Sequence, residues 1–290
     1  MYPLLNTETV HNRILIIGAS GFIGNALYKD LLSYFDVFGT YCTQDLEYKD
    51  NQVFFEFSVE EDTISPILSE IKPRYIVVAN SGAYSRRLQM LQEICEYAGH
   101  FPESRILYIS SSEIFDGQRN FPAYEYDIPI AESKFGRFTI SAEKILLEQL
   151  PLQTTILRLP LVLGVNSPTL IQLRQSMKHH AAFEVFPKHI ISITTEDKIA
   201  QQVHYIINKN LTGIFHLASN DVIHHDDLFM EIATKIGRKM PIFKTVYSSN
   251  EDLYRAILPR DNKLPEALQI TVSEVIDSCT LKEEIVTFKN

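Results

Sequence analysis

The sequence predicts an α/β fold in which a Rossmann-like, doubly wound parallel sheet carries a smaller C-terminal substrate-binding lobe. Two observations predict it. A glycine-rich turn, Gly18 to Gly24, follows directly on an apolar run, and short apolar runs then alternate with longer amphipathic ones along the first half of the chain. The 290 residues, 45% of them hydrophobic, suffice for one large α/β domain or for a nucleotide-binding domain with a smaller partner.

The short apolar runs predict the strands of the sheet. They are rich in Ile, Val, Phe and Tyr, as a sheet that is buried on both faces requires. The predicted strands are Ile14–Ile17, Val37–Tyr41, Val53–Phe57, Tyr75–Val78, Ile106–Ser110 and Thr155–Leu159.

The amphipathic runs between these strands predict crossover helices. Because such crossovers are right-handed, the loops that follow Ile17, Tyr41, Val78 and Ser110 are expected to converge at the carboxyl edge of the sheet, where ligands bind in this fold class. The predicted helices are Phe22–Ser33, Glu60–Ile71, Ser85–Tyr97 and Glu132–Gln149.

The alternation loosens after Leu159, where prolines and a glycine intervene. We therefore predict a nucleotide-binding Rossmann domain over residues 1–160 and the smaller lobe over 161–290. Helices are expected in this lobe at Glu196–Ile207 and His224–Ile236. The strand-like segment Gly213–Ala218 could rejoin the sheet edge, so the two parts are expected to be interleaved.

Composition argues against several partners. With 36 acidic and 27 basic residues the net charge is −9, and no long basic run marks a surface for nucleic acid or an anionic membrane. The first twelve residues lack the features of a signal peptide, and no apolar stretch approaches the roughly 20 residues that cross a bilayer. We therefore expect a cytoplasmic protein. Its three cysteines are widely spaced and are expected to be free thiols.

The three glycines of the turn predict a dinucleotide site. Gly18, Gly21 and Gly24 stand where a backbone must turn tightly, approach a pyrophosphate and pack a helix against the sheet. The alternative is a tight turn that holds no ligand. The predicted cofactor contacts here are Gly18, Ser20, Gly21, Phe22, Ile23 and Gly24.

The end of the second strand bears on NAD against NADP. An NAD-selective site usually carries an acid there for the ribose diol, whereas Phe38–Thr43 has none and the next acid is Asp45. Nothing in that stretch repels a 2′-phosphate, and no Arg or Lys attracts one. NADP is favoured, and NAD stays open.

Later segments carry a family resemblance in their order and spacing. They are Asn80–Ser85, Tyr108–Gly117 with its terminal Phe-Asp-Gly, Ile156–Gly164, Gly213–Ala218 and Pro259–Leu264. Together with the glycine turn, they make the chain resemble the dTDP-4-dehydrorhamnose reductase family of extended short-chain dehydrogenases. The resemblance runs over most of the chain.

This resemblance implies a nicotinamide cofactor and a nucleotide sugar of polysaccharide precursor synthesis. The hydroxyl that binds the substrate carbonyl in the family falls on Ser111, although a serine at the end of a strand is also commonly a cap. Further predicted cofactor contacts are Tyr41, Asn80, Ser81, Gly82 and Tyr84.

The chain departs from the family at the catalytic pair Tyr-x-x-x-Lys. Aligned on Gly136 and Glu143, the Tyr position is Phe135 and the Lys position is Thr139. Phenylalanine has no proton to give and threonine carries no charge. Loss of a positioned proton donor costs roughly 10²–10⁴ in rate.

Other residues are weaker substitutes. Tyr124 or Tyr126 could supply a phenol and Lys134 a charge, but loop tyrosines that pack and a surface lysine are the favoured interpretation. The pairs His179-His180 and His224-His225 are interpreted as solvated surface histidines, and no metal site is predicted.

Three functions therefore stay open. The first is an NAD(P)-binding 4-keto reductase of nucleotide sugars with impaired or atypical catalysis, in which solvent or an unconventional residue gives the proton. The second is a catalytically silent regulatory or scaffold subunit, and the third is an epimerase or dehydratase, which also needs the missing pair. A second copy of the chain or a partner enzyme are both possible partners.

Overall fold

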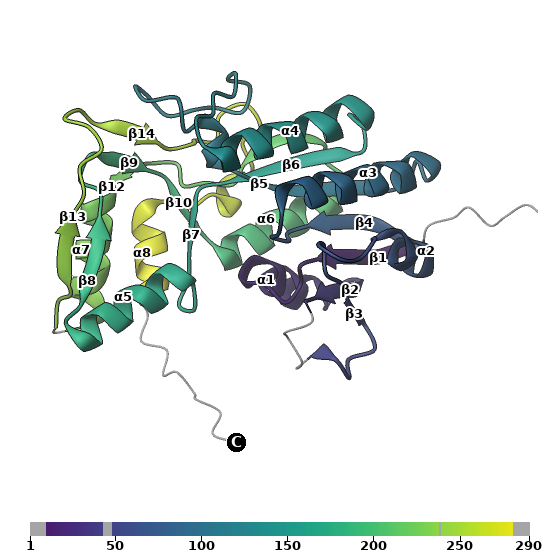
Figure 1. The fold of residues 1–290 in the computed structure, drawn as a ribbon, viewed down its shortest axis with the longest axis horizontal. Helices are drawn as coiled ribbons and strands as arrows, with labels where there is room; N and C mark the ends of the chain where they lie inside the picture. The colour runs from purple at the N-terminus through teal and green to yellow at the C-terminus, as the bar shows by residue number, and fades with distance from the viewer. Residues whose placement is uncertain (1–9, 43–47, 238, 281–290) are drawn as a thin grey trace, which may run out of the picture.

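A parallel sheet forms the centre of the molecule (Figure 1). The computed structural model describes residues 10–42, 48–237 and 239–280. The strands lie in the order β11-β6-β5-β4-β1-β2-β3, all parallel. Their bounds are β1 Val10–Ile17, β2 Asp36–Tyr41, β3 Phe54–Glu56, β4 Pro73–Val78, β5 Arg105–Ser111, β6 Thr154–Leu159 and β11 Gly213–His216.

Helices cover both faces of this sheet (Figure 1). On one face α1 (Phe22–Leu31) and α6 (Glu196–Asn208) pack Leu27, Leu31 and Val203 against the strands. On the other face lie α2 (Ser65–Ile71), α3 (Tyr84–His100) and α4 (Lys134–Gln149). The apolar side chains of the strands are thus buried on both sides.

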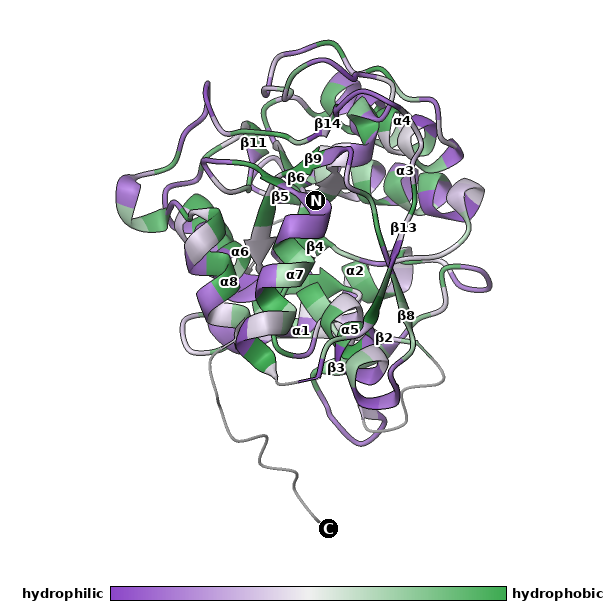
Figure 2. Cartoon of the chain, turned by 90° about the vertical axis from the view of Figure 1, so that its left-hand side faces the viewer, coloured by the Kyte–Doolittle hydropathy of each residue, from purple (hydrophilic) through white to green (hydrophobic). Residues whose placement is uncertain are grey.

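The rest of the chain forms a smaller lobe with its own core, which includes Leu173, Phe183, Phe229 and Ile276. Figure 2 views this lobe and shows that its helices carry both hydrophilic and hydrophobic residues. The helices are α5 Pro168–His179, α7 His225–Ile236 and α8 Val272–Thr280, and the strands are β7 Leu161–Leu163, β8 Ala182–Val185, β9 His189–Ile191, β10 Ile193–Thr195, β12 Ile223–His224, β13 Ile242–Thr245 and β14 Leu253–Arg255.

The predicted fold class is confirmed, and each predicted strand is present within a few residues of its expected bounds. The segment from Gly213 does rejoin the sheet, as β11 beside β6. The prediction that a helix starts at Glu60 is wrong, because α2 begins at Ser65, with Pro66 in its first turn. Helices α5 and α8 were not predicted. Among the described residues, no helix has both the length and the apolar character needed to traverse a bilayer.

Candidate functional site

The turn between β1 and α1 has room for glycine alone at two positions. Gly18 has a φ of +89°, and a Cβ on it would lie 2.8 Å from the Asn80 Cα. A Cβ on Gly24 would lie 2.0 Å from the Gly18 carbonyl oxygen. At Gly21 the nearest atom to such a Cβ is the Gly18 oxygen at 3.3 Å, so this position faces the open side of the turn.

The amino end of α1 is suited to an anion. Its N-cap residue, Gly21, makes no side-chain cap, and its first turn has no acid. The first amides of a helix have no partner within it and carry a partial positive charge. Before the helix, the Gly18 amide donates to the Thr40 hydroxyl at 2.9 Å, which ties the turn to the end of β2.

A cavity of about 420 Å³ lies over this turn. It is bordered by loops from the carboxyl ends of β1, β2 and β4, as predicted for a doubly wound sheet. Its lining includes the predicted residues Gly18, Ser20, Gly21, Tyr41, Asn80, Ser81 and Gly82.

A second cavity, of about 290 Å³, shares Ala79, Asn80 and Ser81 with the first. Phe135 and Thr139 from α4 border it, together with the predicted residues Ile23 and Ser111. The structure thus brings both positions of the altered pair to one cavity. The Thr139 hydroxyl donates to the Phe135 carbonyl oxygen at 2.9 Å, so it is occupied within its own helix.

Aromatic rings gather at the amino ends of α3 and α4. The Tyr84 ring stacks on Phe138 at 4.7 Å between centroids and lies 6.2 Å from the Phe135 ring. Phe135 is 36% exposed. Tyr84, Phe22 and Gly24 were predicted as cofactor contacts, but they line neither of the two cavities.

Ser111 stands between the second cavity and a third. It caps the 3-10 turn η2 (Ser112–Phe115), where its oxygen accepts a hydrogen bond from the Glu113 amide at 3.2 Å. The serine hydrogen stays free to be donated to a ligand. Both the cap and a substrate contact are therefore compatible with its geometry.

The third cavity, of about 700 Å³, lies between η2 and the small lobe and shares Ser111 and Pro160 with the second. It is bordered by Glu113, Arg255 and His225. Burial, with the neighbouring His189, lowers the pKa of His225 to about 4, so its imidazole is neutral at pH 7. The interpretation of His225 as a solvated surface residue is wrong, because α7 turns it towards this cavity.

The remaining histidines of the two pairs lie elsewhere. His179 and His180 are exposed at the end of α5. The His224 Nδ1 lies 2.9 Å from the Pro187 carbonyl oxygen. Within the described ranges, no group of three or more His, Cys, Asp or Glu residues is arranged to hold a metal ion.

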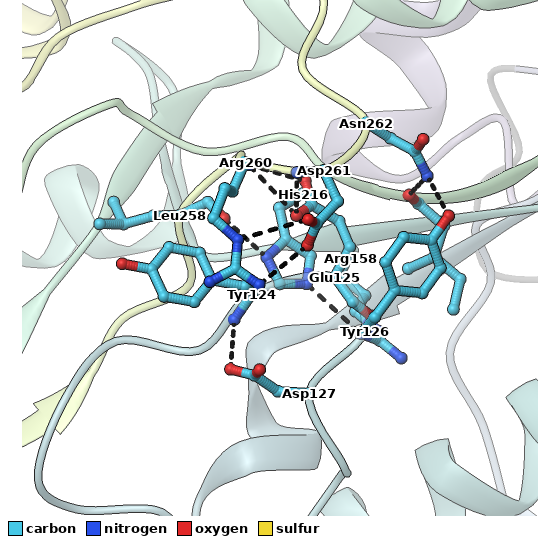
Figure 3. Close-up of polar contacts among 11 residues, drawn as sticks. Tyr124, Glu125, Tyr126, Asp127, Arg158, His216, Leu258, Arg260, Asp261 and Asn262 are labelled. Atoms are coloured by element: carbon cyan, nitrogen blue, oxygen red, sulfur yellow. Dashed lines mark hydrogen bonds and ion pairs between the residues drawn. The ribbon is translucent and has the colours of Figure 1, made fainter.

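The loop tyrosines line none of the three cavities and contact the C-terminal segment instead (Figure 3). The Tyr126 hydroxyl accepts a hydrogen bond from the Asn262 side chain at 3.0 Å. The Arg260 guanidinium lies over the Tyr124 ring, with 3.9 Å between the guanidinium carbon and the ring centroid. Neither tyrosine borders the cavity that holds Phe135. Lys134 is exposed at the start of α4.

Between these tyrosines, the buried Glu125 joins the loop to the C-terminal segment (Figure 3). Its carboxylate accepts hydrogen bonds from the Arg260 and Asp261 amides at 3.0–3.2 Å. Its carbonyl oxygen accepts one from Arg158 at 2.9 Å. The loop is therefore tied to β6 through Arg158, whose guanidinium also pairs with Glu143 of α4.

No sequence motif points to Arg87, which comes from α3 and borders the second cavity. Its neighbour Arg86 has the same chemistry in the sequence, and only the packing of α3 against α4 distinguishes them. Asp45, the first acid after β2, lies outside the described residues.

Comparisons with known proteins show the family of the chain. The family model described as the RmlD substrate binding domain matches residues 12–265. A dTDP-4-dehydrorhamnose reductase from Aggregatibacter actinomycetemcomitans is 23% identical over 262 residues, which cover 82% of this chain and 85% of that protein. The methionine adenosyltransferase 2 subunit beta of Danio rerio is 27% identical over 171 residues, 54% of this chain and only 50% of that protein.

Solved structures share the fold. A dTDP-4-dehydrorhamnose reductase from Yersinia enterocolitica superposes with a TM-score of 0.75 at 20% identity, covering 92% of this chain and 98% of that chain. A dTDP-4-dehydrorhamnose reductase from Bacillus anthracis, solved in complex with NADP, gives 0.74 at 16% identity, covering 93% and 98%.

Proposed function

The chain belongs to the RmlD substrate binding domain family, and from this premise we propose that it binds NADP or NAD over the Gly18–Gly24 turn and a nucleotide sugar beside it. The observation that carries the proposal is the line of three adjoining cavities. The first lies over the phosphate-type turn, the second holds Phe135 and Thr139, and the third opens towards the small lobe. The size and order suit a dinucleotide followed by a second ligand.

The residues of the turn fit the cofactor. The amino end of α1 would hold the pyrophosphate, and the Gly21 side of the turn leaves space for it. Among the described residues, the lining of the first cavity contains no Arg or Lys, and its acid, Glu60, accepts a hydrogen bond from the Ala83 amide at 3.0 Å. NADP stays the favoured form from the sequence, and direct titration of both forms decides between them.

When bound, the cofactor would supply a hydride to a carbonyl carbon. The carbonyl oxygen then needs a hydrogen-bond donor and a proton. Ser111 has a free hydroxyl hydrogen at the boundary of the second and third cavities, so it would orient that oxygen. Phe135 cannot donate the proton, which leaves solvent or another residue and makes turnover slow.

A silent subunit is the second candidate function. Phe135 and Thr139 favour it because the Thr139 hydroxyl is occupied within the helix and the described loop tyrosines point elsewhere. The similarity to a methionine adenosyltransferase subunit points the same way. An epimerase or dehydratase has less support, because it too requires the missing pair.

Cofactor binding is tested by calorimetric titration of NADPH and NADH into the native chain and Gly21→Val. A valine at this open position fills the space of the phosphate, whereas at Gly18 or Gly24 it would clash with the backbone itself. We expect heat with the native chain and none with the variant, at equal helix content by circular dichroism. Equal heats for both proteins, or none for the native chain, contradict the proposal.

A further inference from the structure

Arg87 is a buried cation with no anionic neighbour. It is 8% exposed, and its guanidinium carbon lies 4.6 Å from the centroid of the Phe138 ring. Among the described residues, no hydrogen bond or ion pair of its guanidinium is found. Burial lowers its pKa, while the Tyr108 and Tyr84 hydroxyls raise it. A guanidinium nevertheless keeps its charge in proteins.

A buried charge without a partner is costly, so its position requires a reason. Arg87 borders the second cavity, which is also lined by Tyr108, Ser111 and Thr139. It borders neither the cavity over the glycine turn nor the cavity next to the small lobe. The space in which a ligand could meet Arg87 is therefore the cavity between the proposed phosphate site and Ser111.

The same cavity also has an unpaired acceptor. Asn80 lines both the first and the second cavity, and its side-chain oxygen is buried without a hydrogen-bond donor in the described part of the chain. A ligand hydroxyl both donates and accepts, so it complements a free amide oxygen and a free guanidinium together. A ribose presents two such hydroxyls side by side.

We propose that Arg87 binds the nicotinamide riboside half of the cofactor. It would supply from α3 the positive charge that the family's Lys provides from α4 and that this chain lacks, because Thr139 stands there. This inference rests on the proposed cofactor site. It assigns Arg87 a second effect, because the oxidised nicotinamide ring is cationic and the reduced ring is neutral. A nearby guanidinium in a sheltered cavity repels the former, so it selects the reduced cofactor.

The test is calorimetric titration of NADPH, NADP⁺, NADH and NAD⁺ into the native chain, Arg87→Met and Arg87→Gln, of which Gln retains a donor. Both variants remove the charge. We expect the reduced form to bind about tenfold more weakly to Arg87→Met, since hydrogen bonds to a charged group are lost. The preference for the reduced over the oxidised form should fall by about fivefold in both variants.

Arg87→Lys and Arg137→Met are the matched controls. Lysine keeps the charge and should keep the preference for the reduced cofactor. Arg137 is an exposed residue of α4, and its replacement should change the dissociation constant of neither the reduced nor the oxidised cofactor. An unchanged preference in Arg87→Gln and Arg87→Met overturns the inference while native binding leaves the cofactor site standing. A native chain that binds no dinucleotide overturns both. Thermal melting of each variant verifies that it is folded.

Discussion

Arg158 and Glu143 form an ion pair at the centre of the molecule, between β6 and α4. The two side chains are 2% and 5% exposed, and two hydrogen bonds of 2.7 and 3.0 Å join them. Glu143 also accepts a hydrogen bond from the Ser110 hydroxyl. This network positions the helix that carries Phe135 against the strand that leads to Ser111.

Glu143→Gln is expected to destabilise the protein by about 3–5 kcal/mol, because it leaves the Arg158 charge buried without its counter-ion. The matched control is Glu148→Gln, which makes the same change in an exposed pair with Lys144 one turn along α4 and should cost under about 0.5 kcal/mol. Urea denaturation monitored by circular dichroism measures both. Equal losses would show that Glu143 is not a structural anchor.

Sequence motifs located the residues whose neighbours in the chain define them. Ser111 was predicted from its spacing to Phe115, and Phe135 and Thr139 from their spacing to Gly136 and Glu143. All three residues border one cavity. Arg87 was not found, because its role depends on how α3 packs against α4. His225 was misjudged for the same reason, since its cavity forms only when the small lobe packs over η2.

Helix α4 begins where it does because two acceptors hold its amino end. Ser133 is the N-cap and accepts from the Gly136 amide at 2.9 Å. Asp116, which lies 5% exposed in the Phe-Asp-Gly segment, accepts from the Glu132 and Ser133 amides. Burial raises the pKa of Asp116, but these hydrogen bonds and the nearby Arg255 lower it by more. The pKa therefore lies below the ordinary value of 3.8.

Asp116→Asn should therefore change the pH dependence of stability. A carboxylate whose folded pKa is depressed stabilises the fold above the unfolded pKa, and this contribution is lost as the pH falls through the folded value. We expect the variant to be about 1.5–3 kcal/mol less stable at pH 7, and the difference to shrink below about pH 4. Urea midpoints at several pH values measure it. With Glu132→Gln as a surface control, a difference that grows on acidification contradicts the assignment.

Strands were easier to predict than helices. A strand buried on both faces is a continuous apolar run, and each of the six predicted runs is a strand. Helix α5 was not predicted, because Pro160, Gly164, Pro168 and Pro187 interrupt the apolar pattern around it. Ser167 caps that helix and Pro168 stands in its first turn. A serine followed by a proline is a signal for the start of a helix, but among several other prolines it was not distinguishable from a loop. Helix α8 packs into the core of the small lobe, but it has only nine residues, and so short a stretch does not show a clear helical period of apolar residues.

The proposed function gives the molecule a reductase-type site in which Phe135 stands at the position of the family's proton donor. Turnover with dTDP-4-dehydrorhamnose is expected to be at least about a hundredfold below a typical rate of roughly 10 s⁻¹. The combined change Phe135→Tyr with Thr139→Lys should raise it. Phe135 is 36% exposed and borders the second cavity, so a phenol oxygen has room there. Positions four apart share one helix face, which brings the new ammonium near the phenol.

The single variants divide the possible outcomes. If Arg87 already supplies the positive charge, Phe135→Tyr alone should recover most of the gain, whereas Thr139→Lys alone, which adds no proton donor, should recover none. The measurement is NADPH consumption across a panel of nucleotide 4-keto sugars, with cofactor binding verified separately for each variant. Activity that appears with one sugar supports a retained substrate pocket in the cavity beside Ser111. A double variant that is folded and binds the cofactor, but is inert with every sugar, contradicts a nucleotide-sugar site. This outcome favours the silent subunit, because that function needs no pocket that holds a carbonyl in a reactive position.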